Sequence, residues 1–336
     1  MIIAVDAMGG DHAPAAVVEG VLKALREYPQ IGKILLVGQE ERVRPLLLQH
    51  GIASDSRLEL IHASQVVEMS DKPAEAIRGK KDSSIAVCMR LAKEGKCQAV
   101  VSAGNTGASV AASVFNWRTL PGIDRPGIAT PFPNGTGRFV LLDAGATVDC
   151  TPEHLLGFAV MGEIYARRIL GIAEPRIGLL SNGTEEGKGN ELTKKSHELL
   201  KKAGFKNYLG NVEGRDLFDA SVDVVVCDGF VGNIVLKSCE SIAKMMGGIL
   251  KANLKKNPKR MVGAFLAKNA FAELKKISDY TEYGGAPFLG VNGVFIKAHG
   301  SSNAHALKNA IRVAGEFVEH KVNDAIIDRM KELPKP

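Results

Sequence analysis

The feature that most constrains the fold is a regular alternation of short apolar runs with longer amphipathic stretches. This alternation is typical of strand–helix units that build a largely parallel sheet covered by helices on both faces. Strands are predicted at residues 2–5, 34–37, 58–61, 99–101, 139–142, 177–180 and 222–227. Helices are predicted at residues 14–28, 40–50, 84–94, 105–117, 152–170, 191–202, 232–254 and about 302–331. The sequence therefore predicts a three-layer α/β protein.

The alternation favours one continuous unit, because no strong linker or repeat interrupts it. We expect a single α/β catalytic domain over residues 1–336. The Pro- and Gly-rich residues 121–137 are either a crossing between subdomains or a long surface loop. Beyond residue 276 the pattern changes, and residues 284–293 predict two short strands and a turn, as an antiparallel edge.

The cysteines and the N-terminus indicate a cytoplasmic protein. The five cysteines are scattered and never spaced as Cys-x-x-Cys, which predicts neither a disulfide framework nor a zinc site. Met1 leads directly into the apolar residues 2–5 and lacks the basic leader of a signal peptide. We therefore expect a reducing compartment and no export.

Polar, glycine-containing loops follow five of the predicted strands. In parallel sheets ligands bind beyond the carboxyl ends of the strands, where loop N–H groups and helix N-termini attract anions. One such loop is explained equally well by turn geometry alone. Several on one sheet edge predict a shared phosphate-binding cleft. The loops comprise residues 6–12, 102–107, 143–146, 181–190 and 228–233.

Several familiar motifs are missing from the sequence. No loop has the Gly-x4-Gly-Lys-Ser/Thr spacing of a P-loop or a full Gly-x-Gly-x-x-Gly after a strand. There is also no Gly-x-Ser-x-Gly elbow and no His-Glu-x-x-His. The sequence therefore disfavours an ATPase, a plain dinucleotide enzyme, a serine hydrolase and a zinc protease. We expect no metal and no cofactor.

Three basic side chains lie in or just after these loops, and a fourth, His299, ends a later short strand. Lys188, between two glycines, is expected to point its ammonium into the cleft rather than into solvent, and Lys237 follows Asn233 by one helical turn. His12 either faces an anion or caps the helix that begins near Pro14. His299 precedes two serines that suit either a phosphate or a helix N-cap.

Six blocks of sequence resemble the phosphate acyltransferase family, also known as PlsX. They occur in the same order from the first strand to the last helix. The blocks are DAMGGDHAP at residues 6–14, SAGNTGA at 102–108, GIDRP at 122–126, GKGNELT at 187–193, DGFVGN at 228–233 and KAHGSS at 297–302.

The resemblance implies a reaction, a fold and partners. The reaction is transfer of a fatty acyl group from acyl carrier protein to inorganic phosphate, which yields acyl phosphate for phospholipid synthesis. The implied fold is like that of isocitrate and isopropylmalate dehydrogenases and of phosphotransacetylase, and the implied assembly is a homodimer. Phosphate itself is the nucleophile, so the protein has to position the anion and stabilise the thioester oxyanion.

The resemblance also suggests site residues. Lys188 and Asn233 are expected to be the main phosphate or oxyanion contacts. At two positions the sequence departs from the family pattern, with Ser181 and Thr147 where asparagines are expected, so no catalytic role is assigned to Asn182 or Thr147. Further phosphate or substrate contacts are expected from Asp6, Gly9, Gly10, His12, Asn105, Thr106, Asp228, Lys237, His299 and Ser301.

Residues 251–277 form a basic amphipathic segment. Residues 251–276 hold eight basic residues and one acidic residue, 8 − 1 = +7, while the whole chain carries +6. Apolar residues are interleaved at roughly helical spacing, with breaks expected at Pro258 and Gly263. The segment either packs against a second subunit, lies on anionic lipid or receives the acidic carrier protein. Membrane or carrier contact is expected from Val262, Phe265, Leu266, Lys259 and Arg260.

Rival functions remain open from the residues alone. The enzymatic rivals are an acetyl-phosphate-forming transferase and a decarboxylating dehydrogenase, and the latter lacks a nucleotide fingerprint and a carboxylate cluster. A non-catalytic scaffold that docks carrier protein or membrane gives no reason for the polar loops. Nucleic-acid binding is disfavoured, because aromatic residues make up only 5% of the chain.

Overall fold

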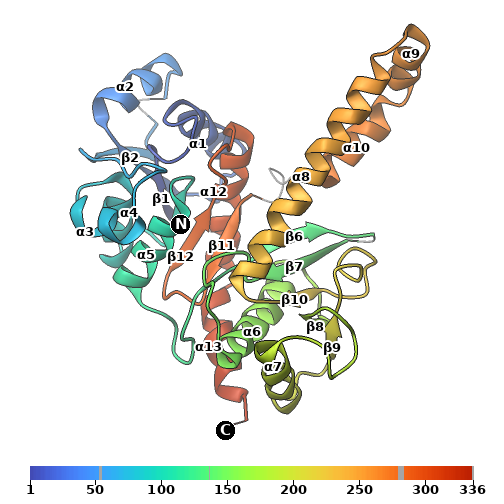
Figure 1. The fold of residues 1–336 in the computed structure, drawn as a ribbon. Helices are drawn as coiled ribbons and strands as arrows, with labels where there is room; N and C mark the ends of the chain where they lie inside the picture. The colour runs from blue at the N-terminus through green and yellow to red at the C-terminus, as the bar shows by residue number, and fades with distance from the viewer. Residues whose placement is uncertain (53–54, 136, 279–283, 335–336) are drawn as a thin grey trace.

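The strands form two sheets in the computed structural model, which describes residues 1–52, 55–135, 137–278 and 284–334 (Figure 1). The first sheet has seven strands. It is parallel from β3 to β12, and β11 then pairs antiparallel with both of its neighbours, β12 and β5. Its order is β3 (Leu58–His62), β2 (Lys33–Gly38), β1 (Ile2–Asp6), β4 (Ala99–Ser102), β12 (Val294–Lys297), β11 (Ala286–Leu289) and β5 (Gly127–Ile128).

The second sheet has five strands, and only its edge strand β6 runs antiparallel to its neighbour. The largely parallel α/β fold is confirmed, but the expected single sheet edge is wrong, since the loops are divided between two sheets. The order is β6 (Thr130–Pro133), β7 (Arg138–Leu142), β10 (Val224–Val226), β8 (Ile177–Leu180) and β9 (Tyr208–Val212).

Helices cover both faces of the first sheet. On one face α1 (Ala15–Glu27) packs against α12 (Ala304–Glu319), where a Cβ on Gly20 would lie 2.7 Å from Leu307 Cβ. The opposite face is covered by α4 (Ser84–Lys93) and α5 (Thr106–Trp117). The side chains of each strand alternate between these two apolar layers, as the pleat requires. Two short helices complete the layers: α2 (Glu40–Gln49) buries Val43 and Leu47 in the same core as α1, and α3 (Pro73–Gly79) packs on α5.

The second sheet is packed by α6 (Pro152–Arg168), and α7 (Glu191–Lys202) packs on α6. The predicted C-terminal helix is in fact two, α12 and α13 (Val322–Glu332), because Lys321 takes a left-handed conformation with φ 49°. The Pro- and Gly-rich stretch contains the crossing between the sheets, since only Ala129 separates β5 from β6. The predicted antiparallel pair exists as β11 and β12, but β12 lies inside the sheet beside β4 rather than at an edge.

A helical arm projects away from both sheets (Figure 1). Its stem is α8 (Gly229–Leu254), whose first turns lie against the second sheet while residues 241–252 are exposed. The arm continues with α9 (Pro258–Leu266) and α10 (Lys268–Ser278). The predicted break near Pro258 is confirmed, whereas the one at Gly263 is wrong, because Gly263 lies inside α9.

Candidate functional site

Three side chains form a row at the carboxyl ends of β1, β4 and β12. Ser102 pairs with Lys297, and Asp6 follows Val5, which pairs with Val101, so all three are at the same level on one face of the sheet. Ser102 Oγ donates a hydrogen bond to Asp6 Oδ2 at 2.6 Å and accepts one from Gly104 N at 3.0 Å. Asp6 Oδ1 also accepts from Met8 N at 3.0 Å. The predicted Asp6 thus holds its own loop together.

The loop after Asp6 is fitted tightly against its neighbours. A Cβ on Gly9 would lie 2.6 Å from Gly104 N and 2.7 Å from Asp6 Oδ2. Gly10 has φ 104°, which side chains disfavour, and a Cβ there would lie 3.0 Å from Gly300 O. Glycine is therefore required at both positions, because neighbouring atoms lie too close for a side chain. Phosphate binding at the two backbone amides stays a prediction.

The two histidines lie near this loop and cap no helix. The N-cap of α1 is Pro14 without a side-chain bond, so the alternative that His12 caps the helix is wrong. The N-cap of α12 is Asn303, which removes the same alternative for Ser301 and Ser302. His299 Nδ1 and Ser301 Oγ are instead 2.8 Å apart, and both residues are exposed.

Lys297 is a candidate that the loop-based prediction missed. Its side chain is only 7% exposed, and among the described residues its ammonium donates one hydrogen bond, to Ala298 O. Burial lowers the pKa of Lys297 to about 8, and the charges of Asp6 and Asp11 partly offset this effect. A lysine at the start of the KAHGSS block, directly after three apolar residues, was the available signal.

Asp143, at the end of β7, organises the second sheet's edge and was also missed as a site residue. It is fully buried, and its carboxylate accepts backbone hydrogen bonds from Ile128, Gly145, Ala146 and Thr147 at 2.7–3.0 Å. Burial raises the pKa of this carboxyl, and those four N–H groups oppose the rise. Asp143 thereby shapes the 143–147 loop.

Asn233 lies against this loop at the start of α8. A Cβ on Gly145 would be 3.6 Å from Asn233 Oδ1, while a Cβ on Gly232 would be 1.9 Å from Asp143 O, so the helix begins directly on the strand end. The predicted Asp228 is the N-cap of α8 and accepts from Val231 N at 2.9 Å. Lys237 is exposed one turn beyond Asn233.

A pocket of about 390 Å³ opens at the same edge, between the N-termini of α7 and α8. Ser181 Oγ is buried there and has no hydrogen-bond partner among the described residues. Two helix N-termini and an unpaired hydroxyl make the pocket suited to an anion. Its lining comprises Leu155, Leu180, Ser181, Asn182, Gly189, Asn190, Thr193, Cys227, Asp228 and Val231.

Lys188 lies on the loop that borders this pocket. The loop is held in place because Asn182 Oδ1 accepts from Gly189 N at 2.8 Å and Asn211 Nδ2 donates to Glu185 O at 2.9 Å. Lys188 is exposed, its stem lies over Gly183, and within the described part of the chain its ammonium makes no hydrogen bond or ion pair. Its charge is therefore available to a ligand.

The predicted site residues thus fall into two groups. Asp6, Gly9, Gly10, His12, Asn105, Thr106, His299 and Ser301 belong to the first sheet's edge; Lys188, Asp228, Asn233 and Lys237 belong to the second's. A direct link joins the sheets, since Ile128 N of β5 donates to Asp143 Oδ1 at 2.8 Å and Ala144 N donates to Ile128 O at 3.0 Å.

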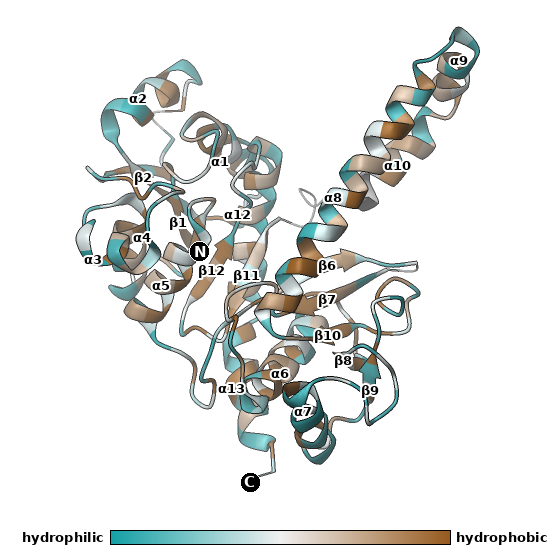
Figure 2. Cartoon of the chain, viewed as in Figure 1, coloured by the Kyte–Doolittle hydropathy of each residue, from teal (hydrophilic) through white to brown (hydrophobic). Residues whose placement is uncertain are grey.

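The arm carries the predicted lipid or carrier contacts. Phe265 is 68% exposed and Leu266 78% exposed, and Val262, Lys259 and Arg260 are exposed as well. Apolar and polar residues are interspersed along the arm (Figure 2). A groove of about 540 Å³ lies between its helices, lined by Gly247, Leu250, Lys251, Leu254, Lys255, Met261, Ala264 and Phe271.

Residues 1–52, 55–135, 137–278 and 284–334 contain no helix long and apolar enough to span a membrane. In the same ranges no three His, Cys, Asp or Glu side chains are grouped so that they could hold a metal ion.

The architecture defines an α/β protein with the fold of the phosphotransacetylases. A phosphotransacetylase from Streptococcus pyogenes superposes with a TM-score of 0.61 over 99% of this chain and 94% of its own, at 19% identity. At that identity the likeness concerns the fold.

Sequence relatives identify the family. Residues 1–325 match the model of the family described as "Fatty acid synthesis protein". The phosphate acyltransferase of Pelobacter propionicus is 50% identical over 99% of this chain and 95% of its own length. That of Desulfitobacterium hafniense (strain DCB-2) is 51% identical over 100% of this chain and 98% of its own. The chain belongs to the phosphate acyltransferase family, and the expected acyltransferase activity is confirmed.

Proposed function

We propose that the chain transfers a fatty acyl group from acyl carrier protein to inorganic phosphate. An oxygen of phosphate attacks the thioester carbonyl carbon, the C–S bond breaks, and the carrier thiolate leaves with the electron pair and takes up a proton. The products are acyl phosphate and free carrier thiol. The observation that carries the proposal is the pocket between the N-termini of α7 and α8, which holds an unpaired buried hydroxyl and is bordered by the loop that carries the exposed Lys188.

In this proposal Lys188 and Asn233 act directly on the reacting groups. The Lys188 ammonium neutralises the incoming phosphate, while the Asn233 amide donates to phosphate or to the thioester oxyanion. The loops of the first sheet supply further substrate contacts to the same catalytic unit, through the amides of Gly9 and Gly10 and the side chains of His12, Thr106, His299 and Ser301. The Asp143–Ile128 link keeps both sheets in register for this task.

The experiment mixes purified protein, a long-chain acyl carrier thioester and phosphate, and traps the product with hydroxylamine as a hydroxamate. Formation of hydroxamate that requires phosphate supports the proposal. Efficient reaction of an acetyl thioester but not of a long-chain one would favour the acetyl-phosphate rival instead.

We also propose that the arm joins two copies of the chain. Apolar residues are exposed on successive turns of α8 beside the groove, and a contiguous apolar surface of this kind is typical of a protein–protein interface. A second arm packed alongside would bury them, which supports a homodimer. The exposed apolar residues are Ile242, Met245, Met246, Ile249 and Leu250.

The tip of the arm is proposed to contact an anionic surface. Val262, Phe265 and Leu266 are exposed on α9 beside Lys259 and Arg260, a combination that suits the interface of an anionic membrane. The alternative at the same tip is the acidic carrier protein. The location that follows is the cytoplasm, with peripheral contact at the inner face of the cell membrane.

A further inference from the structure

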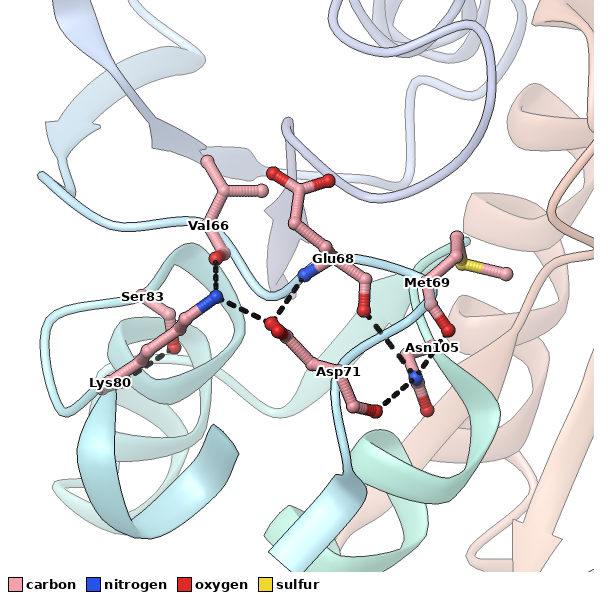
Figure 3. A network of polar contacts seen from close by, with 7 residues as sticks. All are labelled: Val66, Glu68, Met69, Asp71, Lys80, Ser83 and Asn105. Atoms are coloured by element: carbon pink, nitrogen blue, oxygen red, sulfur yellow. Dashed lines mark hydrogen bonds and ion pairs between the residues drawn. The ribbon is translucent and has the colours of Figure 1, made fainter. Parts of the chain in front are cut away.

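The side chain of Asn105 is fully occupied by the chain itself, although the sequence predicted a phosphate contact. Its Nδ2 donates to the carbonyl oxygens of Met69, Asp71 and Glu68 at 3.0, 3.2 and 3.4 Å. Its Oδ1 accepts from Ala108 N at 3.0 Å and caps α5. Asn105 therefore fastens residues 68–71 to the start of α5 (Figure 3).

A second set of polar contacts, made by Lys80, holds the other side of residues 66–71 (Figure 3). Lys80 Nζ lies 2.5 Å from Asp71 Oδ2 and donates to Val66 O at 2.9 Å. The Lys80 ammonium lowers the pKa of the Asp71 carboxyl, which also accepts from Glu68 N at 2.8 Å. Residues 66–71 are thus held at both sides by independent polar contacts.

The fastened segment places an apolar side chain beside the first sheet's loops. Met69 is 52% exposed, and a Cβ on Gly300 would lie 3.3 Å from Met69 Cε. Gly300 O accepts from Asp11 N at 2.8 Å, so Met69 borders the loops that carry Asp11 and His299. An exposed methionine among polar loops offers a flexible apolar surface to a substrate.

We propose that Asn105 is a positioning residue, which together with the Lys80–Asp71 pair holds Met69 as the apolar wall for the acyl chain of the thioester. This inference rests on the proposed acyl transfer and deepens it. It assigns Asn105 an indirect role through Met69 and no contact with phosphate.

The test compares two variants that loosen the segment from different sides. Asn105→Asp keeps the Oδ1 acceptor that caps α5 but removes the Nδ2 donor, and Lys80→Met removes the ion pair. Each is expected to raise KM for a long-chain acyl carrier thioester about fivefold, as loss of a hydrogen bond allows. KM for phosphate should stay unchanged. Lys81→Met, an exposed neighbour, is the matched control.

Hydrogen exchange supplies a readout besides activity. Both variants should speed exchange at the Glu68 amide, which donates to Asp71 in the closed segment. Met69→Ala should leave exchange unchanged and lower the ratio of kcat/KM for long over short acyl chains about tenfold, while Met69→Leu retains it.

The inference would be overturned by either of two results. Asn105→Asp alone raising KM for phosphate would make Asn105 a phosphate ligand. An unchanged chain-length profile in Met69→Ala would remove Met69 from the acyl site. Both results presuppose a wild-type protein that forms acyl phosphate. If the wild-type protein forms none, the proposed function itself fails, and this result is distinct from the two above.

Discussion

Asp143 Oδ1 accepts a hydrogen bond from Ile128 N at 2.8 Å, and this contact joins the end of a central strand of the second sheet to the edge strand of the first. The same carboxylate accepts the amides of the 143–147 loop, against which Asn233 lies. A single buried side chain therefore supports both the sheet junction and one wall of the candidate site.

Replacing Asp143 by Asn should destabilise the protein. The amide turns an acceptor into a donor that faces backbone N–H groups, so buried amides lose partners at a cost of about 2–4 kcal/mol. Urea denaturation should show a lower midpoint, and Asp149→Asn, at an exposed position in the same loop, should change it little. Equal stability of the two variants would contradict the role of the Asp143 carboxylate in holding the loop and the sheet junction.

Replacing Lys188 by Ala should lower kcat without loss of stability, because the side chain is exposed and its ammonium has no partner among the described residues. Removing one charge-stabilising donor typically costs roughly 10²–10³-fold in rate. Asn233→Ala should act in the same direction. Steady-state kinetics measure kcat for each variant, with Lys194→Ala as the exposed control. An equal loss of kcat in Lys194→Ala would contradict a specific role of Lys188.

The buried Lys297 predicts a pH-dependent stability. Its folded-state pKa of about 8 lies below the ordinary 10.5, so between these values the unfolded chain binds more protons and the free energy of unfolding rises with pH. Relative to Lys297→Met, wild type should gain up to about 3 kcal/mol between about pH 7 and pH 10. Denaturation series at several pH values measure this gain. Lys23→Met, at an exposed position on α1, should show the same pH dependence of stability as wild type. If the stability of wild type relative to Lys297→Met fell as pH rises, the lowered pKa of Lys297 would be contradicted.

The arm tip can be tested with liposomes. Replacing Val262, Phe265 and Leu266 together by Ser removes apolar area that an interface would bury, so flotation with anionic liposomes should fall. The dimer, proposed along α8, should persist in sedimentation experiments. Liposome binding that survives the triple replacement would place the membrane contact elsewhere on the chain.

The sequence predicted the strand–helix order well, because apolar periodicity is a local property. It did not predict the division into two sheets, since the two strands at the crossing were not predicted and are short: β5 has two residues and β6 four. Their pairing depends on contacts distant in sequence, such as Ile128 with Asp143. The loss of helix at Lys321 is likewise decided by the backbone.

The candidate site was predicted in part, since motif blocks identify loops but not partners. Asn105 and Asp228 have the expected positions, yet their side chains serve the chain as clamp and N-cap. Lys297 and Asp143 were missed because burial, rather than residue type, makes them distinctive. Lys188 is a predicted residue whose ammonium makes no hydrogen bond or ion pair among the described residues.

The central claim is tested most directly by following free carrier thiol while phosphate is varied. Long-chain acyl carrier protein is mixed with purified enzyme, and thiol release and acyl phosphate are measured together. The account predicts that release saturates with phosphate and that each thiol released is matched by one acyl phosphate. Thiol release that is independent of phosphate, or the absence of release at every phosphate concentration, would contradict it.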